Sequence, residues 1–191
     1  ENDDPDENIP IYELCVHTPE TTNDMIVNAD LYKAPTILII GGTHGNEKAS
    51  TMALYLFIKD LLENFETDPI LGDIKSNVNF KIIPCINPTG YSRNSRLTAS
   101  GTDISRNSAY MWEESSHSAK GTAPFSAPES AILRDWIIEN RNAFFIINWH
   151  NMTRNASNRP TETASYLITP NPEMTKWYSP LLRRMSIKWS K

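Results

Sequence analysis

Two histidines and a glutamate occupy positions from which their side chains could hold one metal ion. His44 and Glu47 lie three residues apart, directly after an apolar run that ends in two glycines, and His150 ends a second apolar run. Ligands bind at the carboxyl edge of α/β sheets, and neighbouring parallel strands would bring the three side chains to one such edge. Two imidazoles and a carboxylate suit Zn²⁺ and leave a fourth position for water, as in catalytic sites. The sequence therefore predicts one Zn²⁺ per chain, bound by His44, Glu47 and His150.

The pair formed by His44 and Glu47 is a weak signal when taken alone. A surface histidine beside a glutamate in the first turn of a helix gives the same pattern. The position of His150 at the end of another buried-type strand makes the metal interpretation much stronger. His17 and His117 do not follow such strands, so we interpret both as surface or loop histidines.

The elements that must position these side chains follow from hydrophobic periodicity. Continuous β-branched or apolar runs predict core strands, with a further short strand near the start of the chain; these cover residues 35–42, 80–86, 143–149, 164–169 and 11–17. Three- and four-residue spacing of apolar side chains predicts helices over residues 47–65, 127–140 and 172–189. Strands that alternate with such helices indicate an α/β fold, with a mostly parallel mixed sheet flanked by helices. Residues 1–10 are expected to be an acidic, flexible lead-in, and residues 11–191 a single domain.

Composition narrows the classes of partner. The 191 residues carry a net charge of −5 without a cluster of lysine and arginine, which argues against a nucleic-acid surface. No apolar stretch reaches the roughly 18 residues that a membrane span requires. We therefore expect a soluble protein, with a secreted or periplasmic location as a working hypothesis. The segment 87–125 is rich in Ser, Thr, Asn and Gly, and loops of this length are usually functional or disordered.

Several motifs follow one another in an order that resembles the zinc carboxypeptidase family. They are His44-x-x-Glu47, Asn-Pro-Thr-Gly at 87–90, Arg96, Gly-Thr-Asp-Ile-Ser-Arg-Asn at 101–107, Pro-Phe-Ser-Ala-Pro-Glu at 124–129, and a strand ending in His150. The resemblance spans roughly residues 36–169 and is far more specific than any single motif. It implies a zinc carboxypeptidase-like fold with His44, Glu47 and His150 as the zinc ligands.

The resemblance also implies roles for residues around the zinc. Asp103 would accept a hydrogen bond from the far nitrogen of a zinc-bound histidine and fix its tautomer. Arg96 would be the catalytic arginine that polarises the scissile carbonyl and stabilises the developing oxyanion, with Arg93 as a rival for this position.

Substrate binding is implied for residues near the second arginine motif. Arg106 matches the arginine that clamps the terminal carboxylate of the substrate, a task suited to a planar guanidinium. Ser105 and Asn151 are also expected to contact the substrate. Ser105 departs from the family, which usually has asparagine there, and serine lacks the reach of an amide. This departure weakens the prediction that a terminal carboxylate is recognised.

The catalytic glutamate of the family has no counterpart in the expected strand context. Only Glu162 and Glu173 follow His150, so the resemblance implies that the chain stops short of the catalytic base. The leading hypothesis is a zinc hydrolase that cleaves an amide bond next to a carboxylate-bearing residue of a peptide or cell-wall peptide. Two alternatives stay open: an N-acyl amino acid amidohydrolase of the desuccinylase and aspartoacylase type, and a zinc-binding module without catalysis.

Overall fold

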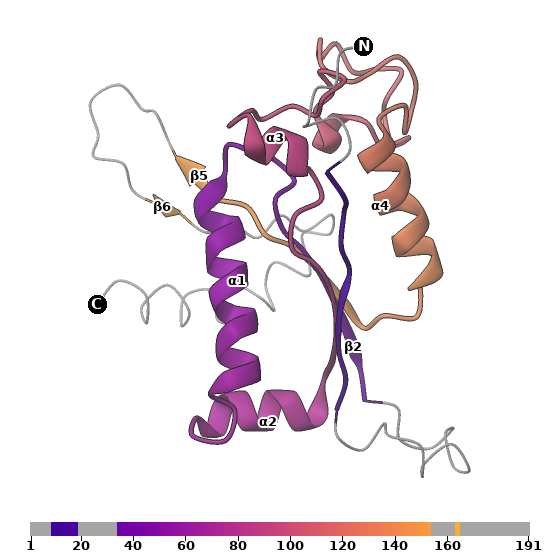
Figure 1. The fold of residues 1–191 in the computed structure, drawn as a ribbon. Coiled ribbons are helices and arrows are strands. Elements are labelled where there is room, and N and C mark those ends of the chain that lie inside the picture. Colours follow the sequence, from indigo (N-terminus) through magenta and orange to yellow (C-terminus); the bar gives the residue numbers. More distant parts are fainter. Residues whose placement is uncertain (1–8, 19–33, 154–162, 165–191) are drawn as a thin grey trace. The chain divides into compact units, whose positions relative to one another are not determined.

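The computed structural model describes residues 9–18, 34–153 and 163–164 (Figure 1). The chain divides into two compact units, residues 1–150 and 151–191. Most of the acidic lead-in and the helix expected over 172–189 lie outside the described residues. The assignment of residues 11–191 to a single domain stays a prediction.

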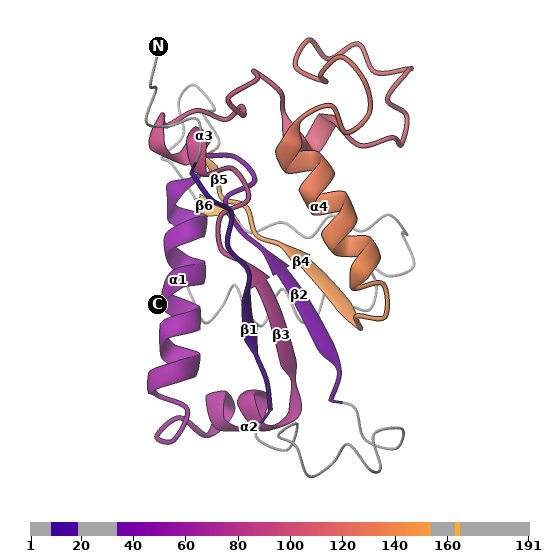
Figure 2. The same cartoon turned by 45° about the vertical axis from the view of Figure 1, so that its right-hand side comes forward.

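A four-stranded mixed sheet forms the centre of the first unit. In spatial order its strands are β1 (Leu14–Val16), β3 (Asn79–Ile83), β2 (Thr36–Ile40) and β4 (Phe145–Asn148). β2 runs parallel to both β3 and β4, whereas β1 pairs antiparallel with β3 (Figure 2). This arrangement confirms the predicted mostly parallel sheet, and it places the carboxyl ends of β2, β3 and β4 at one edge.

The middle strand β2 is buried on both faces, which explains its continuous apolar sequence. Ile39 packs in one apolar cluster, while Leu38 and Ile40 pack in another. Successive side chains of a strand point to opposite faces, so the two clusters occupy opposite faces of the sheet.

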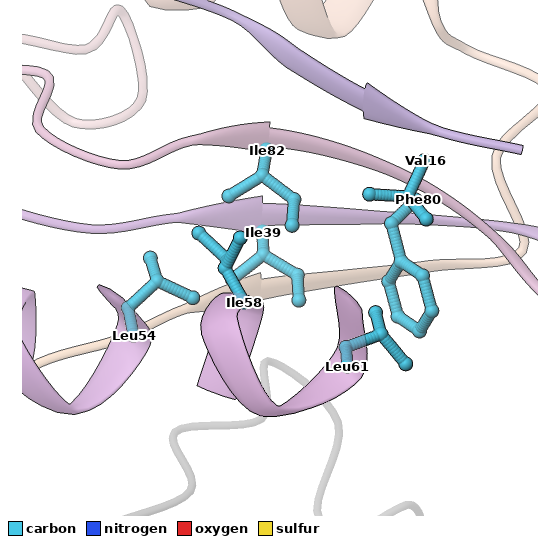
Figure 3. Packing of buried hydrophobic residues seen from close by; sticks show 7 residues of the cluster. All are labelled: Val16, Ile39, Leu54, Ile58, Leu61, Phe80 and Ile82. Atoms are coloured by element: carbon cyan, nitrogen blue, oxygen red, sulfur yellow. The ribbon is translucent and has the colours of Figure 1, made fainter. Parts of the chain in front are cut away.

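The helix α1 (Lys48–Glu63) covers one of these faces. Its apolar side chains recur at helical spacing and meet those of β1, β2 and β3 in a cluster of Val16, Ile39, Leu54, Ile58, Leu61, Phe80 and Ile82 (Figure 3). Burying one such side chain contributes roughly 1.5–3 kcal/mol relative to leaving it exposed. The cluster therefore fixes α1, and with it the turn between β2 and α1. The helix predicted over 47–65 is confirmed.

The opposite face is covered by α4 (Pro128–Glu139), in agreement with the helix predicted over 127–140 (Figure 2). Pro128 occupies the first helical turn, where its missing N–H costs no intrahelical hydrogen bond. Trp136 packs in the second apolar cluster, and its indole nitrogen donates to Oε1 of Glu13 at 2.7 Å. This bond ties α4 to the segment that leads into β1.

The helix α2 (Pro69–Asn77) is not anticipated by the apolar pattern, since none of its residues is fully buried and only Leu71 and Ile74 pack partly against the first apolar cluster. Its start is instead fixed by Asp68, whose side chain accepts hydrogen bonds from the backbone of Ile70 and Leu71. Among the described stretches of the chain, no helix is long and apolar enough to cross a lipid bilayer.

In the second unit the described strands are β5 (Met152–Thr153) and β6 (Thr163–Ala164), which pair antiparallel. The strand predicted over 164–169 therefore meets the described residues only at Ala164. The remainder of that prediction lies outside them.

The long polar segment 87–125 is organised by hydrogen bonds instead of apolar periodicity. It contains α3 (Pro88–Ser92) and a short 3-10 helix, η3 (Ile104–Arg106).

Asn107 is fully buried, and its amide nitrogen lies within hydrogen-bond distance of three acceptors: the Lys120 carbonyl (2.7 Å), the Ala123 carbonyl (2.9 Å) and the Ser126 hydroxyl (3.1 Å). Its Oδ1 accepts from the backbone N–H of Ala127 at 3.1 Å. One side chain thus joins η3 to the start of α4.

Candidate metal centre

The turn between β2 and α1 positions the first histidine and the glutamate. Gly42 adopts a positive φ of 61°, which a residue with a side chain rarely adopts. The turn is tied to the end of β3, because the backbone carbonyls of Gly41 and Gly42 accept hydrogen bonds from the two residues that follow Cys85. His44 is buried in this turn, and Glu47 is the residue immediately before α1.

Gly45 allows this turn to lie against α3. A Cβ at Gly45 would come within 1.9 Å of the backbone carbonyl carbon of Gly90. We expect Gly45→Ala to lower the free energy of unfolding by about 3 kcal/mol, because backbone cannot yield as a flexible side chain can. Gly101→Ala is the comparison variant, because a Cβ there meets no atom within 4 Å, and the positive φ of Gly101 (77°), which Gly45 lacks, costs alanine only about 1–2 kcal/mol. Urea unfolding of both variants tests this, and equal losses would contradict it.

His44, Glu47 and His150 come together at the carboxyl edge of the sheet. Nδ1 of His44 lies 2.7 Å from Oε1 of Glu47, and Nδ1 of His150 lies 2.9 Å from Oε2 of the same carboxylate. The two imidazole rings are 4.8 Å apart between their centroids. The carboxylate therefore bridges two imidazoles whose Nδ1 atoms both face it.

The donor set fits Zn²⁺. One potential ligand atom from each of the three residues lies within 4.8 Å of the other two. Tetrahedral Zn²⁺ with bonds of about 2.0–2.2 Å separates its ligand atoms by roughly 3.3–3.6 Å. The two contacts between the histidine Nδ1 atoms and the Glu47 oxygens, at 2.7 and 2.9 Å, are shorter than this. A bound ion would replace the hydrogen-bonding protons in these contacts and lengthen each by less than about 1 Å.

A second layer of polar side chains surrounds His44. Its Nε2 atom lies 3.2 Å from Oδ1 of fully buried Asp103 and 3.1 Å from the hydroxyl of Ser105. The Arg96 guanidinium donates to Oδ2 of Asp103 at 2.9 Å and lies 3.5 Å from Oε1 of Glu47. The structure thus brings Asp103, Ser105 and Arg96 to the metal-binding group.

The two carboxylates in this cluster are held in their ionised form. Burial would raise the pKa of Glu47, but hydrogen bonds with His150 and His44 outweigh it and lower the pKa to about 2. Asp103 behaves in the same way: burial opposes ionisation, yet His44 and Arg96 hold its pKa well below the usual range. For His44, burial lowers the pKa but hydrogen bonds to Asp103 and Glu47 prevail and raise it. Both carboxylates are therefore ionised, and Arg96 balances one of the two negative charges.

The remaining predicted site residues lie in other surroundings. Arg106 is exposed at the end of η3 and, with Ser105, lines a cavity of about 320 Å³ whose other walls are Ser108, Tyr110, Met111, Glu114 and Ser115. Asn151 is the first residue of the second unit, so its contact with substrate stays a prediction. Arg93, the rival of Arg96, is exposed at the C-terminal end of α3.

Two features of the centre were missed from the sequence. The hydroxyl of Thr43 donates to Oδ1 of Asn148 at 2.8 Å. This hydrogen bond connects the residue before His44 to the end of β4, two residues before His150. Asn107 organises the loop that carries Asp103 and Ser105. Asn107 ends the 101–107 motif in the sequence, but its burial and its hydrogen bonds are visible only in the structure.

Comparison with known proteins identifies the family and agrees with the fold. A family model described as zinc carboxypeptidase matches residues 7–186. Carboxypeptidase B of Astacus astacus is 32% identical over 127 residues, which cover 55% of this chain and 41% of that protein. A protein named inactive metallocarboxypeptidase, from Talaromyces marneffei, is 24% identical over 135 residues, or 58% of this chain and 23% of that one.

A solved structure supports the same fold. The crystal structure of thrombin activatable fibrinolysis inhibitor matches with a TM-score of 0.63 and 23% identity, over 74% of this chain and 39% of that chain. The chain therefore spans about two fifths of the Astacus astacus relative and of the solved chain. Because the family model covers nearly all of its residues, the chain belongs to the zinc carboxypeptidase family.

Proposed function

We propose that this chain carries the zinc site of a hydrolase that cleaves the amide bond next to a carboxylate-bearing residue of a peptide. The observation that carries the proposal is the convergence of His44, Glu47 and His150, with both Nδ1 atoms facing one carboxylate. Membership of the zinc carboxypeptidase family supports the reaction type.

The three residues would hold Zn²⁺ with one position left for water or substrate. Zinc bound there would supply polarisation of the amide carbonyl and activation of water. Asp103 would keep the Nε2 proton of His44 in place, so that Nδ1 is available as a ligand atom. Arg96 is oriented by Asp103 beside Glu47, where its guanidinium could stabilise negative charge that develops on the substrate oxygen.

Arg106 is proposed to bind the carboxylate of the substrate. Its guanidinium is exposed and borders the cavity that begins at Ser105, whose hydroxyl contacts His44. A planar, permanently charged guanidinium can form two hydrogen bonds with a carboxylate. The shared cavity wall and the contact of Ser105 with His44 support a substrate whose carboxylate binds Arg106 while its amide bond lies near His44.

The proposal is tested by hydrolysis in the natural protein. We expect N-acylated dipeptides to be cleaved at the terminal amide bond, chelator to stop the reaction and Zn²⁺ to restore it. An N-acyl amino acid without a peptide bond serves as the second substrate. Cleavage of this compound alone would favour the amidohydrolase alternative, and turnover that survives complete removal of metal would contradict the proposal.

A second candidate function is zinc binding without catalysis. It is supported by the Talaromyces marneffei relative, whose name describes that protein as inactive. In this case the natural protein would hold zinc with the ligands named above and cleave neither kind of substrate. The same hydrolysis experiment, combined with a zinc assay, separates the two functions.

The role proposed for Asp103 leads to a prediction about zinc affinity. Asp103→Asn should weaken zinc binding by roughly 10–100-fold, because the amide no longer accepts as strongly from Nε2 of His44. The measurement is competition with a fluorescent chelator, normalised to folded protein. Asp135→Asn on the exposed face of α4 is the control. An unchanged affinity in Asp103→Asn would contradict the role.

A further inference from the structure

His44 and His150 follow β2 and β4, and among the described residues the backbone pairing of these strands ends before either histidine. β2 and β4 pair in register up to Ile40 and Asn148. Among the described residues, the last backbone hydrogen bond between these two strands, counted toward their carboxyl ends, is the one that the N–H of Trp149 donates to the Ile40 carbonyl at 2.8 Å. His44 lies four residues beyond Ile40, so the strand ladder does not fix its distance from His150.

In the part of the chain that the structure describes, backbone hydrogen bonds join the turn before His44 to the segment after β3, and none joins it to the segment after β4. The N–H groups of Ile86 and Asn87 donate to the carbonyls of Gly41 and Gly42 at 3.0 and 3.1 Å. The segment that bears one histidine is therefore anchored on one side of β2, while the other histidine follows the strand on the opposite side.

Thr43 connects the segment that bears His44 to the strand that leads to His150. Its side chain is only 1% exposed, and its hydroxyl donates to Oδ1 of Asn148 at 2.8 Å. Thr43 immediately precedes His44, and Asn148 lies two residues before His150. The bond is thus a side-chain tie between the two segments, placed next to both histidines.

The histidines are also connected through Glu47, whose two oxygens contact both Nδ1 atoms, and their rings lie 4.8 Å apart between centroids. Those contacts use the same atoms that would bind zinc, so they would be rearranged when the ion enters. The Thr43 to Asn148 hydrogen bond uses none of these atoms and can persist in both states.

We propose that Thr43 and Asn148 are positioning residues, which set the separation of His44 and His150 for zinc binding. The inference rests on the proposed zinc site and adds to it the hydrogen bond that sets the distance between the two histidines. A preorganised site loses less free energy in ordering its ligands, so the tie should raise zinc affinity without touching the ion.

The test compares zinc affinity in three variants by chelator competition. Thr43→Val keeps the shape of the side chain and removes the donor, and we expect affinity to fall roughly three- to tenfold, the effect of one neutral hydrogen bond. Thr43→Ser keeps the hydroxyl and should stay within about twofold of wild type. Asn148→Ala removes the acceptor. The double variant Thr43→Val/Asn148→Ala should bind zinc no more weakly than whichever single variant has the lower affinity, because both changes remove the same hydrogen bond.

Thermal unfolding of the metal-free variants separates positioning from general stability. A purely structural role predicts a lower unfolding temperature for Thr43→Val but unchanged zinc affinity in the folded protein, and this result would overturn the inference. Additive losses in the double variant would overturn it too. If wild type itself binds no zinc, the proposed function fails first, so the two failures are distinguishable.

Discussion

Replacing Glu47 with alanine is expected to weaken zinc binding by more than about 100-fold, because even outer hydrogen-bond partners of a zinc ligand contribute 10–100-fold. Glu47 is the only member of the group that contacts both histidines, at 2.7 and 2.9 Å. Its removal also takes away the carboxylate whose pKa is lowered to about 2, and hence the negative charge nearest the imidazoles. Competition with chelators of graded affinity measures the loss.

The control for Glu47→Ala is Glu63→Ala, at the opposite end of the same helix. Glu63 is exposed and makes a long ion pair with Lys59 at 3.8 Å. Its replacement should leave zinc affinity unchanged and stability within about 0.5 kcal/mol. If both variants bound zinc as wild type does, Glu47 would not be a ligand.

Asn107→Ala is expected to lower the free energy of unfolding by roughly 4 kcal/mol, since one buried amide supplies hydrogen bonds to several backbone groups. The substitution would leave the carbonyls of Lys120 and Ala123 and the N–H of Ala127 without this partner. It would also create a cavity where a fully buried side chain stood. The loop that carries Asp103 would loosen as a result, so zinc affinity should fall along with stability.

Ser108→Ala is the control for this loop, because Ser108 is the next residue and is exposed. Denaturant unfolding followed by circular dichroism gives both free energies. A loss below about 1 kcal/mol in Asn107→Ala would show that the loop is held by other contacts.

The sheet, and the edge that carries the three candidate metal ligands, could be predicted because their signals are local. Residues 37–40 form an apolar run that belongs to a strand buried on both faces, and the structure places them in β2. His44 and His150 each follow such a run, and the parallel pairing of β2 and β4 brings them together. The placement of the two histidines thus follows from strand ends, whereas Glu47 follows from its position at the start of α1, three residues after His44.

The remaining parts depend on contacts that the local sequence does not encode. α2 has only two apolar side chains, Leu71 and Ile74, that are partly buried against the core, and it begins at an aspartate cap, so apolar spacing gives little sign of it. Asn107 bonds to residues 13 to 20 positions away, and Thr43 to one 105 positions away. Ser105 was assigned to substrate from a family position, whereas its hydroxyl lies at Nε2 of His44; its part in substrate binding stays a prediction.

The most direct measurement is the zinc content of purified wild-type protein beside that of His150→Ala. With His44, Glu47 and His150 as ligands, wild type should hold about one zinc per chain and the variant almost none. Failure of wild-type protein to bind zinc, even after Zn²⁺ is added, would contradict the proposed metal centre.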